Sequence, residues 1–218
     1  MIMLDFVSNA FITLLVTIDP IGLAPLFVTL TRGMDKSERR EVAVRGCIIG
    51  FCILLVFGLS GQAFLDALGI SLPAFRIAGG ILLFWLAFEM VFEKRTERRD
   101  NTATRAIDKD HIKNIAVFPL AIPLMAGPGA IAAMVLLSHE AHELAGWTGT
   151  GALVGVLLVI ILACLTVFLL AGRIERMLGN TGRIILTRLL GVILSALAVQ
   201  FVADGVTQLV VAANQVVL

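Results

Sequence analysis

Residues 17–27, TIDPIGLAPLF, interrupt an apolar run that is otherwise long enough to cross a membrane as one helix. Proline removes a backbone donor and clashes with the carbonyl one turn earlier, and glycine tolerates the dihedral angles of an unwound segment. Asp19, Pro20, Gly22 and Pro25 therefore predict a break near the middle of this span. Freed backbone groups are costly in lipid unless they line a cavity or meet a partner, so a break at this depth indicates a functional position.

A second interrupted run, FPLAIPLMAGPGAIAAM, occupies residues 118–134. Gly127, Pro128 and Gly129 lie near the middle of this run, with Pro119 and Pro123 upstream. Two broken helices at equivalent depths are typical of a substrate site between the halves of a transporter. The alternative is that these prolines only kink packed helices, which is common in membrane proteins.

The composition around both breaks is that of an integral membrane protein. Of the 218 residues, 59% are hydrophobic and 15% are charged, whereas soluble domains have about 25% charged residues. Runs without the alternation of a membrane barrel predict helices rather than strands. We predict one all-α transmembrane domain with six spans, of which the first and fourth are discontinuous. The spans are expected at about 6–30, 42–65, 74–92, 115–138, 150–172 and 184–211.

The basic residues predict the orientation of these spans. Segments 31–45, 93–113 and 172–188 hold 16 of the 17 lysines and arginines, and only Arg76 falls on the other side. Basic loops remain in the cytoplasm, so a multi-pass protein of the cell inner (cytoplasmic) membrane with both termini outside is expected. We interpret residues 93–113 as a solvated cytoplasmic linker.

Short sequence matches indicate an internal repeat. The matches are Pro20 with Pro128, Leu68–Gly69 with Leu178–Gly179, and Arg76–Gly79 with Arg188–Gly191, at offsets of 108, 110 and 112 residues. They predict one repeat at about 1–92 and a second at about 114–218. Because three crossings reverse the direction of the chain, the second repeat is inverted, a plan that transporters use with the substrate near the membrane midplane.

The breaks also suggest a ligand. In this topology the second halves of both broken spans begin at the midplane, where their bare N–H groups and positive dipole ends favour an anion such as a carboxylate. Unwound carbonyls upstream of the first break, together with Asp19, can accept an ammonium group. A zwitterionic amino acid satisfies both.

Three charged residues carry alternatives that the sequence leaves open. Asp19 is either a substrate partner or proton carrier, or an N-cap of the helix that starts at Pro20. Arg76 and Arg188, near the starts of the third and sixth spans, are either candidate gate residues or interfacial arginines that snorkel. Glu89 and Asp204 lie near span ends, where we expect them to be solvated.

Enzyme, metal and nucleic-acid functions find no support. The GLSG stretch at 58–61 resembles an intramembrane protease motif, but His111, His139 and His142 are all expected in loops, so Ser60 lacks a base. SHEAHE at 138–143 departs from the spacing of H-E-x-x-H and is interpreted as a solvated loop. A net charge of +1 gives no field for nucleic acid. No catalytic residue, metal or cofactor is predicted.

Four segments carry a resemblance to a known family. They are TIDPIGLAPLFVTLT near the start, FRIAGGILLFWLAFEM in the third span, FPLAIPLMAGPGAI in the fourth and GVILSALAVQFVADGV in the sixth. Together they resemble the MarC family, also called the SnatA-type neutral amino acid transporters. The resemblance covers nearly the whole chain, but Leu23 stands where many members of that family have asparagine.

The resemblance implies six spans in two inverted repeats that move small neutral amino acids such as glycine and alanine. It also implies that the broken spans hold the substrate. The implied substrate-binding residues are Asp19, Pro20 and Gly22 on one side and Gly127, Pro128 and Gly129 on the other.

The function expected from the sequence is therefore secondary transport of a small neutral amino acid by alternating access, with a proton or sodium ion as candidate coupling ion and membrane lipid as the surrounding partner. The alternatives are an exporter of other small solutes and a membrane scaffold or assembly protein without transport activity. Transport direction and oligomeric state are not predicted.

Overall fold

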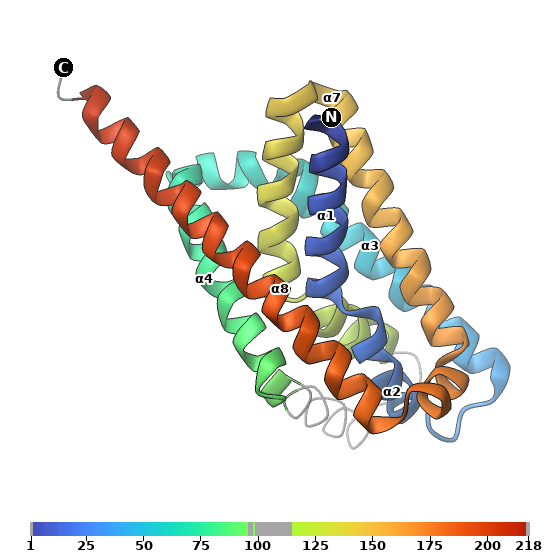
Figure 1. Cartoon of the computed structure of the whole chain (residues 1–218). Helices are drawn as coiled ribbons and strands as arrows, with labels where there is room; N and C mark the ends of the chain where they lie inside the picture. Colours follow the sequence, from blue (N-terminus) through green and yellow to red (C-terminus); the bar gives the residue numbers. More distant parts are fainter. Residues whose placement is uncertain (1, 96–97, 99–114, 217–218) are drawn as a thin grey trace.

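The computed structural model describes residues 2–95, 98 and 115–216, and every element in this part of the chain is a helix. Most of the predicted linker at 93–113, including His111, lies outside the described residues. The elements, labelled in Figure 1, are α1 (Ile2–Ile18), α2 (Pro20–Leu30), α3 (Lys36–Ala67), α4 (Leu72–Val91), the π-type helix η1 (Ala116–Met125), α7 (Pro128–Leu169) and α8 (Ala171–Val216).

Five helical stretches of the described chain are long and apolar enough to cross a membrane. They are Ile2–Leu30, Lys36–Ala67, Leu72–Val91, Pro128–Leu169 and Thr181–Ala212, and Ala116–Met125 is a shorter apolar helix. The predicted all-α, multi-pass membrane fold is thereby confirmed. The expected runs at 6–30, 42–65 and 184–211 each fall in one of these stretches, and 74–92 exceeds Leu72–Val91 by one residue. The run 115–138 spans η1 and the start of α7, and 150–172 covers the last part of α7 and the first residues of α8.

Helix α7 turns back on itself and so consists of two arms. Ala145 and Gly146 leave the helical region, with φ/ψ of −150°/21° and 56°/−136°, and the arms run in opposite directions from this turn (Figure 1). Gly149 packs so closely on the first arm that a Cβ there would collide with the carbonyl oxygen of Ala141. The prediction of a solvated loop at 138–143 is wrong, because these residues continue the first arm as helix.

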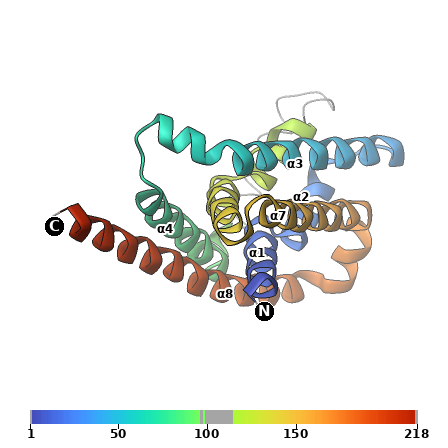
Figure 2. The same cartoon turned by 90° about the horizontal axis from the view of Figure 1, so that it is seen from above.

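The basic segments adjoin one end of the molecule. The α2–α3 connection, the end of α4 and the α7–α8 junction lie together at the lower end in Figure 1, whereas the N-terminus and the turn of α7 lie at the upper end. This arrangement agrees with the charge segregation in the sequence. Figure 2, viewed from above, shows the strongly inclined α3 and α8 on opposite sides of α1 and α7.

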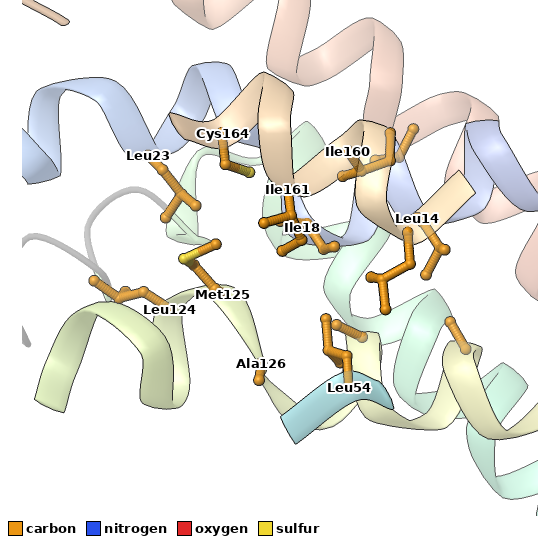
Figure 3. Packing of buried hydrophobic residues seen from close by; sticks show 14 of the residues in the cluster. Leu14, Ile18, Leu23, Leu54, Leu124, Met125, Ala126, Ile160, Ile161 and Cys164 are labelled. Carbon is orange, nitrogen blue, oxygen red and sulfur yellow. The ribbon is translucent and has the colours of Figure 1, made fainter. Parts of the chain in front are cut away.

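A buried apolar cluster joins the helices around the two breaks. Ile18 and Leu23 flank the first break, and Met125 precedes the second. They lie with Ile161 and Cys164 from the second arm of α7 (Figure 3). Both interruptions of the chain are therefore embedded in the core, where each freed backbone group needs a partner within the protein.

Glycines allow close contacts between α4 and α8. A Cβ on Gly80 would lie 2.9 Å from the carbonyl oxygen of Ala198 and 2.7 Å from Cγ2 of Val202. A Cβ on Gly205 would lie 2.9 Å from the carbonyl oxygen of Pro73. Membrane helices use such small residues because close backbone approach increases van der Waals contact where lipid provides no hydrophobic driving force.

We expect Gly80→Val to destabilise the protein, because the added side chain meets backbone atoms of α8 that cannot move aside. Overpacking of this kind costs about 1–3 kcal/mol. Gly151→Val is the matched control, since a Cβ at Gly151 meets nothing within 4 Å. Melting of both variants in detergent measures the difference, and equal melting temperatures would contradict the observed α4–α8 packing.

Candidate functional site

The first break is a compact cap built by Asp19, Pro20 and Gly22. Asp19 has left-handed dihedral angles, φ 58° and ψ 68°, and its Oδ1 accepts a hydrogen bond from the N–H of Gly22 at 3.0 Å. Pro20 occupies the first helical position, where a missing N–H costs nothing. A Cβ on Gly22 would collide with the carboxylate of Asp19, so the D-P-x-G spacing has a steric cause. The N-cap role considered for Asp19 is confirmed.

Arg95 completes the first break from a distant part of the sequence. Its guanidinium donates to the carbonyl oxygen of Val16, at 3.3 Å from Nη1, and to that of Thr17. Nη1 also lies 3.9 Å from Oδ2 of Asp19, and both side chains are 4% exposed. The last carbonyl groups of a helix lack helical partners and carry a partial negative charge. The guanidinium of Arg95 therefore stabilises both these carbonyl groups and the carboxylate of Asp19.

This contact corrects the interpretation of 93–113 as a wholly solvated linker, because Arg95 is only 3% exposed. The sequence contains a signal for the contact between Arg95 and the first break. A carboxylate buried at midspan requires a cation or a donor set, and the linker supplies the nearest basic residues after the third span. Arg95 was nevertheless not predicted as the partner of Asp19, because the charged composition of 93–113 is typical of a solvated loop.

The second break has glycine at its centre. Helix α7 begins at Pro128, with Gly127 as an extended N-cap whose φ and ψ are −79° and 168° and which has no side-chain capping bond. A Cβ on Gly127 would lie 2.8 Å from the carbonyl oxygen of Pro123 in η1. The chain can therefore pass this close to η1 only because residue 127 is glycine. The first N–H groups of α7 therefore lie at this break without a side-chain cap. This is the end of the helix at which the dipole is positive.

A cavity of about 360 Å³ lies between the two breaks. Thr17 and Arg95 line it from the first break, and Gly127, Pro128 and Gly129 line it from the second. Two stretches more than a hundred residues apart in the sequence therefore face one space. The predicted residues of the second break border this cavity directly.

Helix α4 forms the apolar wall of the cavity and also carries a buried carboxylate. Leu82, Trp85 and Leu86 line the cavity together with Arg98. Nε1 of Trp85 donates to Oε1 of Glu89 at 3.1 Å, and Nη1 of Arg98 lies 3.0 Å from the same oxygen. The prediction that Glu89 is solvated is wrong, because Glu89 is 5% exposed and its Oε2 is buried with no hydrogen-bond partner in the part of the chain that the structure describes.

The remaining predicted site residues lie outside the cavity lining. Asp19, Pro20 and Gly22 do not line it, but Asp19 lies 3.9 Å from Nη1 of Arg95, which does. The candidate gate residues Arg76 and Arg188 lie at opposite ends of α4. Arg76 is buried near the start of α4, while Arg188 is exposed and forms an ion pair of 3.4 Å with Glu93, just beyond its end.

No group of three or more histidine, cysteine, aspartate or glutamate side chains that could hold a metal ion occurs among the described residues. The polar groups of the cavity are instead two guanidinium groups, backbone groups of the two breaks and the hydroxyl-bearing Thr17. This set can bind a small charged solute by hydrogen bonds and ion pairs.

We expect Arg95→Gln to destabilise the protein more than Asp19→Asn. Glutamine leaves the carboxylate buried without its cation, and breaking a buried pair in this way costs about 3–5 kcal/mol. Asparagine still caps α2 and tolerates left-handed backbone. The double variant should cost less than the sum of the single variants, with a coupling of about 0.5–3 kcal/mol.

Unfolding of the four proteins in detergent measures this coupling. Arg188→Gln is the control, because its ion pair with Glu93 is exposed and such pairs contribute about 0–1 kcal/mol. Strictly additive costs for Asp19→Asn and Arg95→Gln would show that the two side chains do not interact.

Known proteins match the chain over almost its entire length. The model of the MarC family of integral membrane proteins matches residues 4–210. The UPF0056 membrane protein of Archaeoglobus fulgidus is 36% identical over 211 residues, which are 94% of each chain. That of Methanocaldococcus jannaschii is 38% identical over 209 residues, 93% of this chain and 97% of the relative.

A bacterial relative shows the same similarity. The UPF0056 membrane protein YvbG of Bacillus subtilis is 34% identical over 207 residues, which are 93% of this chain and 95% of YvbG. No solved structure matches the chain. The resemblance carried by the segments around the two breaks is thus confirmed over both halves of the sequence, and the chain belongs to the MarC family of integral membrane proteins.

Proposed function

We propose that this protein is a secondary transporter that moves small neutral amino acids, of the glycine and alanine type, across the inner membrane by alternating access. The observation that carries the proposal is the cavity of about 360 Å³ lined by both broken stretches. Small-molecule sites commonly measure about 300–1,000 Å³, so this volume suits a small solute. No step of this function requires an enzyme activity or a cofactor.

The charges around the cavity suit a zwitterion. Arg95, Arg98 and the uncapped N–H groups at the start of α7 favour a carboxylate. The carbonyl oxygens of Val16 and Thr17, together with Asp19, suit an ammonium group, and a guanidinium already binds there. A substrate ammonium would replace the guanidinium of Arg95, and the released arginine would pair with the substrate carboxylate.

This exchange of partners supplies a physical link between substrate binding and conformation. Arg95 follows α4 in the chain and holds the end of α1, so its release frees one contact between these two elements. A ligand shifts a conformational equilibrium only through such differential contacts. In this proposal Asp19 contributes charge as well as capping, and a proton or sodium ion supplies the coupling.

Two inverted repeats are part of the proposal. Counting the arms of α7 separately gives six spans, in groups of three at about 1–92 and 114–218. The two breaks fall at corresponding places, as Pro20 and Pro128 each occupy the first turn of a helix. Gly69 and Gly179, which correspond in the sequence repeat, have similar positive φ angles of 67° and 60°. These likenesses support the plan described for inverted-repeat transporters.

Glycine or alanine at millimolar concentration should raise the melting temperature of the purified protein and be transported in proteoliposomes. Gly129→Leu should abolish both effects, because its side chain enters the cavity and its Cβ already lies 3.1 Å from Cδ2 of Leu86. Gly155→Leu, on the exposed face of α7 with nothing within 4 Å of a Cβ, should retain both.

Circular dichroism of the Gly129→Leu protein verifies that it remains folded. Normal binding and transport by this folded variant would place the substrate elsewhere. Absence of any response of the wild-type protein to either amino acid would refute the proposed substrate class.

The orientation has a separate test. The α2–α3 connection, the end of α4 and the α7–α8 junction, which carry or flank the basic segments, lie at one end of the molecule and favour that end as cytoplasmic and the termini as external. In a background without Cys47, Cys52 and Cys164, Lys94→Cys should react with an impermeant thiol reagent only from the cytoplasmic side. Trp147→Cys, beside the turn of α7, should react only from outside. Labelling of both from the same side would contradict the topology.

A further inference from the structure

A second cavity, remote from the two breaks, gathers basic side chains. Its volume is about 440 Å³, and it lies where the end of α2 and the start of α3 meet the α7–α8 junction. Lys36, Arg39 and Arg40 line it from α3, and Arg173 lines it from the start of α8. Two parts of the chain that are far apart in the sequence thus bring four positive charges to one space.

The acidic side chains at the start of α3, which are next to this cavity in the sequence and are described by the structure, have other partners. Oδ1 of Asp35 accepts from the N–H groups of Ser37 and Glu38, at 2.7 and 2.8 Å. Oε2 of Glu38 accepts from the N–H of Asp35 at 2.8 Å, which completes a capping box at the start of α3. Glu41 pairs with Arg45 at 2.8 Å. None of these three carboxylates forms an ion pair with a basic side chain of the cavity lining.

The four basic residues form no ion pair with any carboxylate of the described chain. In addition, Nε of Arg39 is buried and has no hydrogen-bond acceptor among the described residues. A buried N–H that lacks an acceptor is costly, more so on a charged group, and neighbouring like charges repel. An anion in the cavity would remove both penalties.

Apolar side chains beside the charges indicate what kind of anion fits. The rings of Phe27 and Phe168 stack with centroids 4.8 Å apart and line the cavity. Leu169 and Leu170 also line it and are 53% and 39% exposed. A ligand with an anionic head and apolar chains would contact both parts, whereas a free inorganic anion would use only the charges.

We propose that this cavity binds the phosphodiester headgroup of an anionic phospholipid, with the acyl chains along Leu169 and Leu170. Basic pockets between membrane helices recognise anionic headgroups in this way. The site joins the start of α3 to the α7–α8 junction, so a bound lipid would hold these elements together. The inference is independent of the amino-acid site.

The test uses the full-length protein in mixed micelles with phosphatidylglycerol or with phosphatidylcholine. The wild-type protein should melt several degrees higher with phosphatidylglycerol and retain it in native mass spectrometry. The double variant Arg39→Gln/Arg173→Gln should lose both effects. Arg39→Lys/Arg173→Lys should recover most of them, because it restores the charges without the guanidinium geometry.

The matched control is Arg32→Gln/Lys94→Gln, which removes two exposed charges from the same end of the molecule but none from the cavity lining. It should keep the full preference for phosphatidylglycerol. If this control lost the preference for phosphatidylglycerol to the same extent, the preference would result from general surface charge, and the proposal would be overturned. Equal melting of the wild-type protein in the two lipids would overturn it as well.

Inorganic phosphate and glycerol 3-phosphate, added without lipid, separate the possible sources of the anion. Neither should reproduce the shift at concentrations equal to that of the lipid. If either does, and phosphatidylglycerol adds nothing further, the site is one for soluble phosphate and the lipid assignment is wrong. The melting shift with glycine should be the same in the wild-type protein and in both glutamine variants.

Discussion

The site depends on one constraint, namely that backbone groups released inside a membrane must find partners within the protein. Interrupting α1 at Ile18 leaves carbonyl groups at its end, and Arg95 takes up those of Val16 and Thr17. The same guanidinium lies near Asp19, which in turn binds the start of α2. A break that would be intolerable in lipid thus becomes a stable feature, because one cation serves two helix ends. Two residues of this arrangement, Thr17 and Arg95, also line the cavity.

The local features of the fold could be predicted from the sequence, because their causes are local. Proline at the first turn and glycine where a Cβ would collide determine both breaks, and both are visible as D-P-x-G and A-G-P-G in apolar runs. The described parts of the chain that carry or flank the basic segments likewise lie at one end of the molecule. Partners that meet through tertiary packing could not be predicted in this way. Arg95 is 76 positions from Asp19 and belongs to a segment whose composition is typical of a solvated loop.

Glu89 illustrates the same limit. The position of Glu89 near a span end suggested solvation. However, Trp85, one turn earlier on α4, and Arg98, beyond the end of α4, both contact its carboxylate. The prediction for the SHEAHE stretch at 138–143 was wrong for a related reason. Its polar composition suggested a loop, but the helix continues to the turn at Ala145 and Gly146. Neither the contacts of Glu89 with Trp85 and Arg98 nor the continuation of the helix through residues 138–143 can be seen in the local composition. Charged residues near the ends of membrane helices are therefore poorly placed by pattern, whereas glycine and proline inside them are well placed.

The first arm of α7 has a mechanical consequence. It is a continuous helix between Pro128 and the turn at Ala145, with a non-helical joint at each end. At 1.5 Å per residue such an arm is about 25 Å long, so a tilt of about 10° around the upper joint would displace its lower end by roughly 4 Å. That lower end carries Gly129, which borders the cavity. A small rotation at the joint formed by Ala145 and Gly146 would therefore become a displacement of several ångströms at the wall of the cavity.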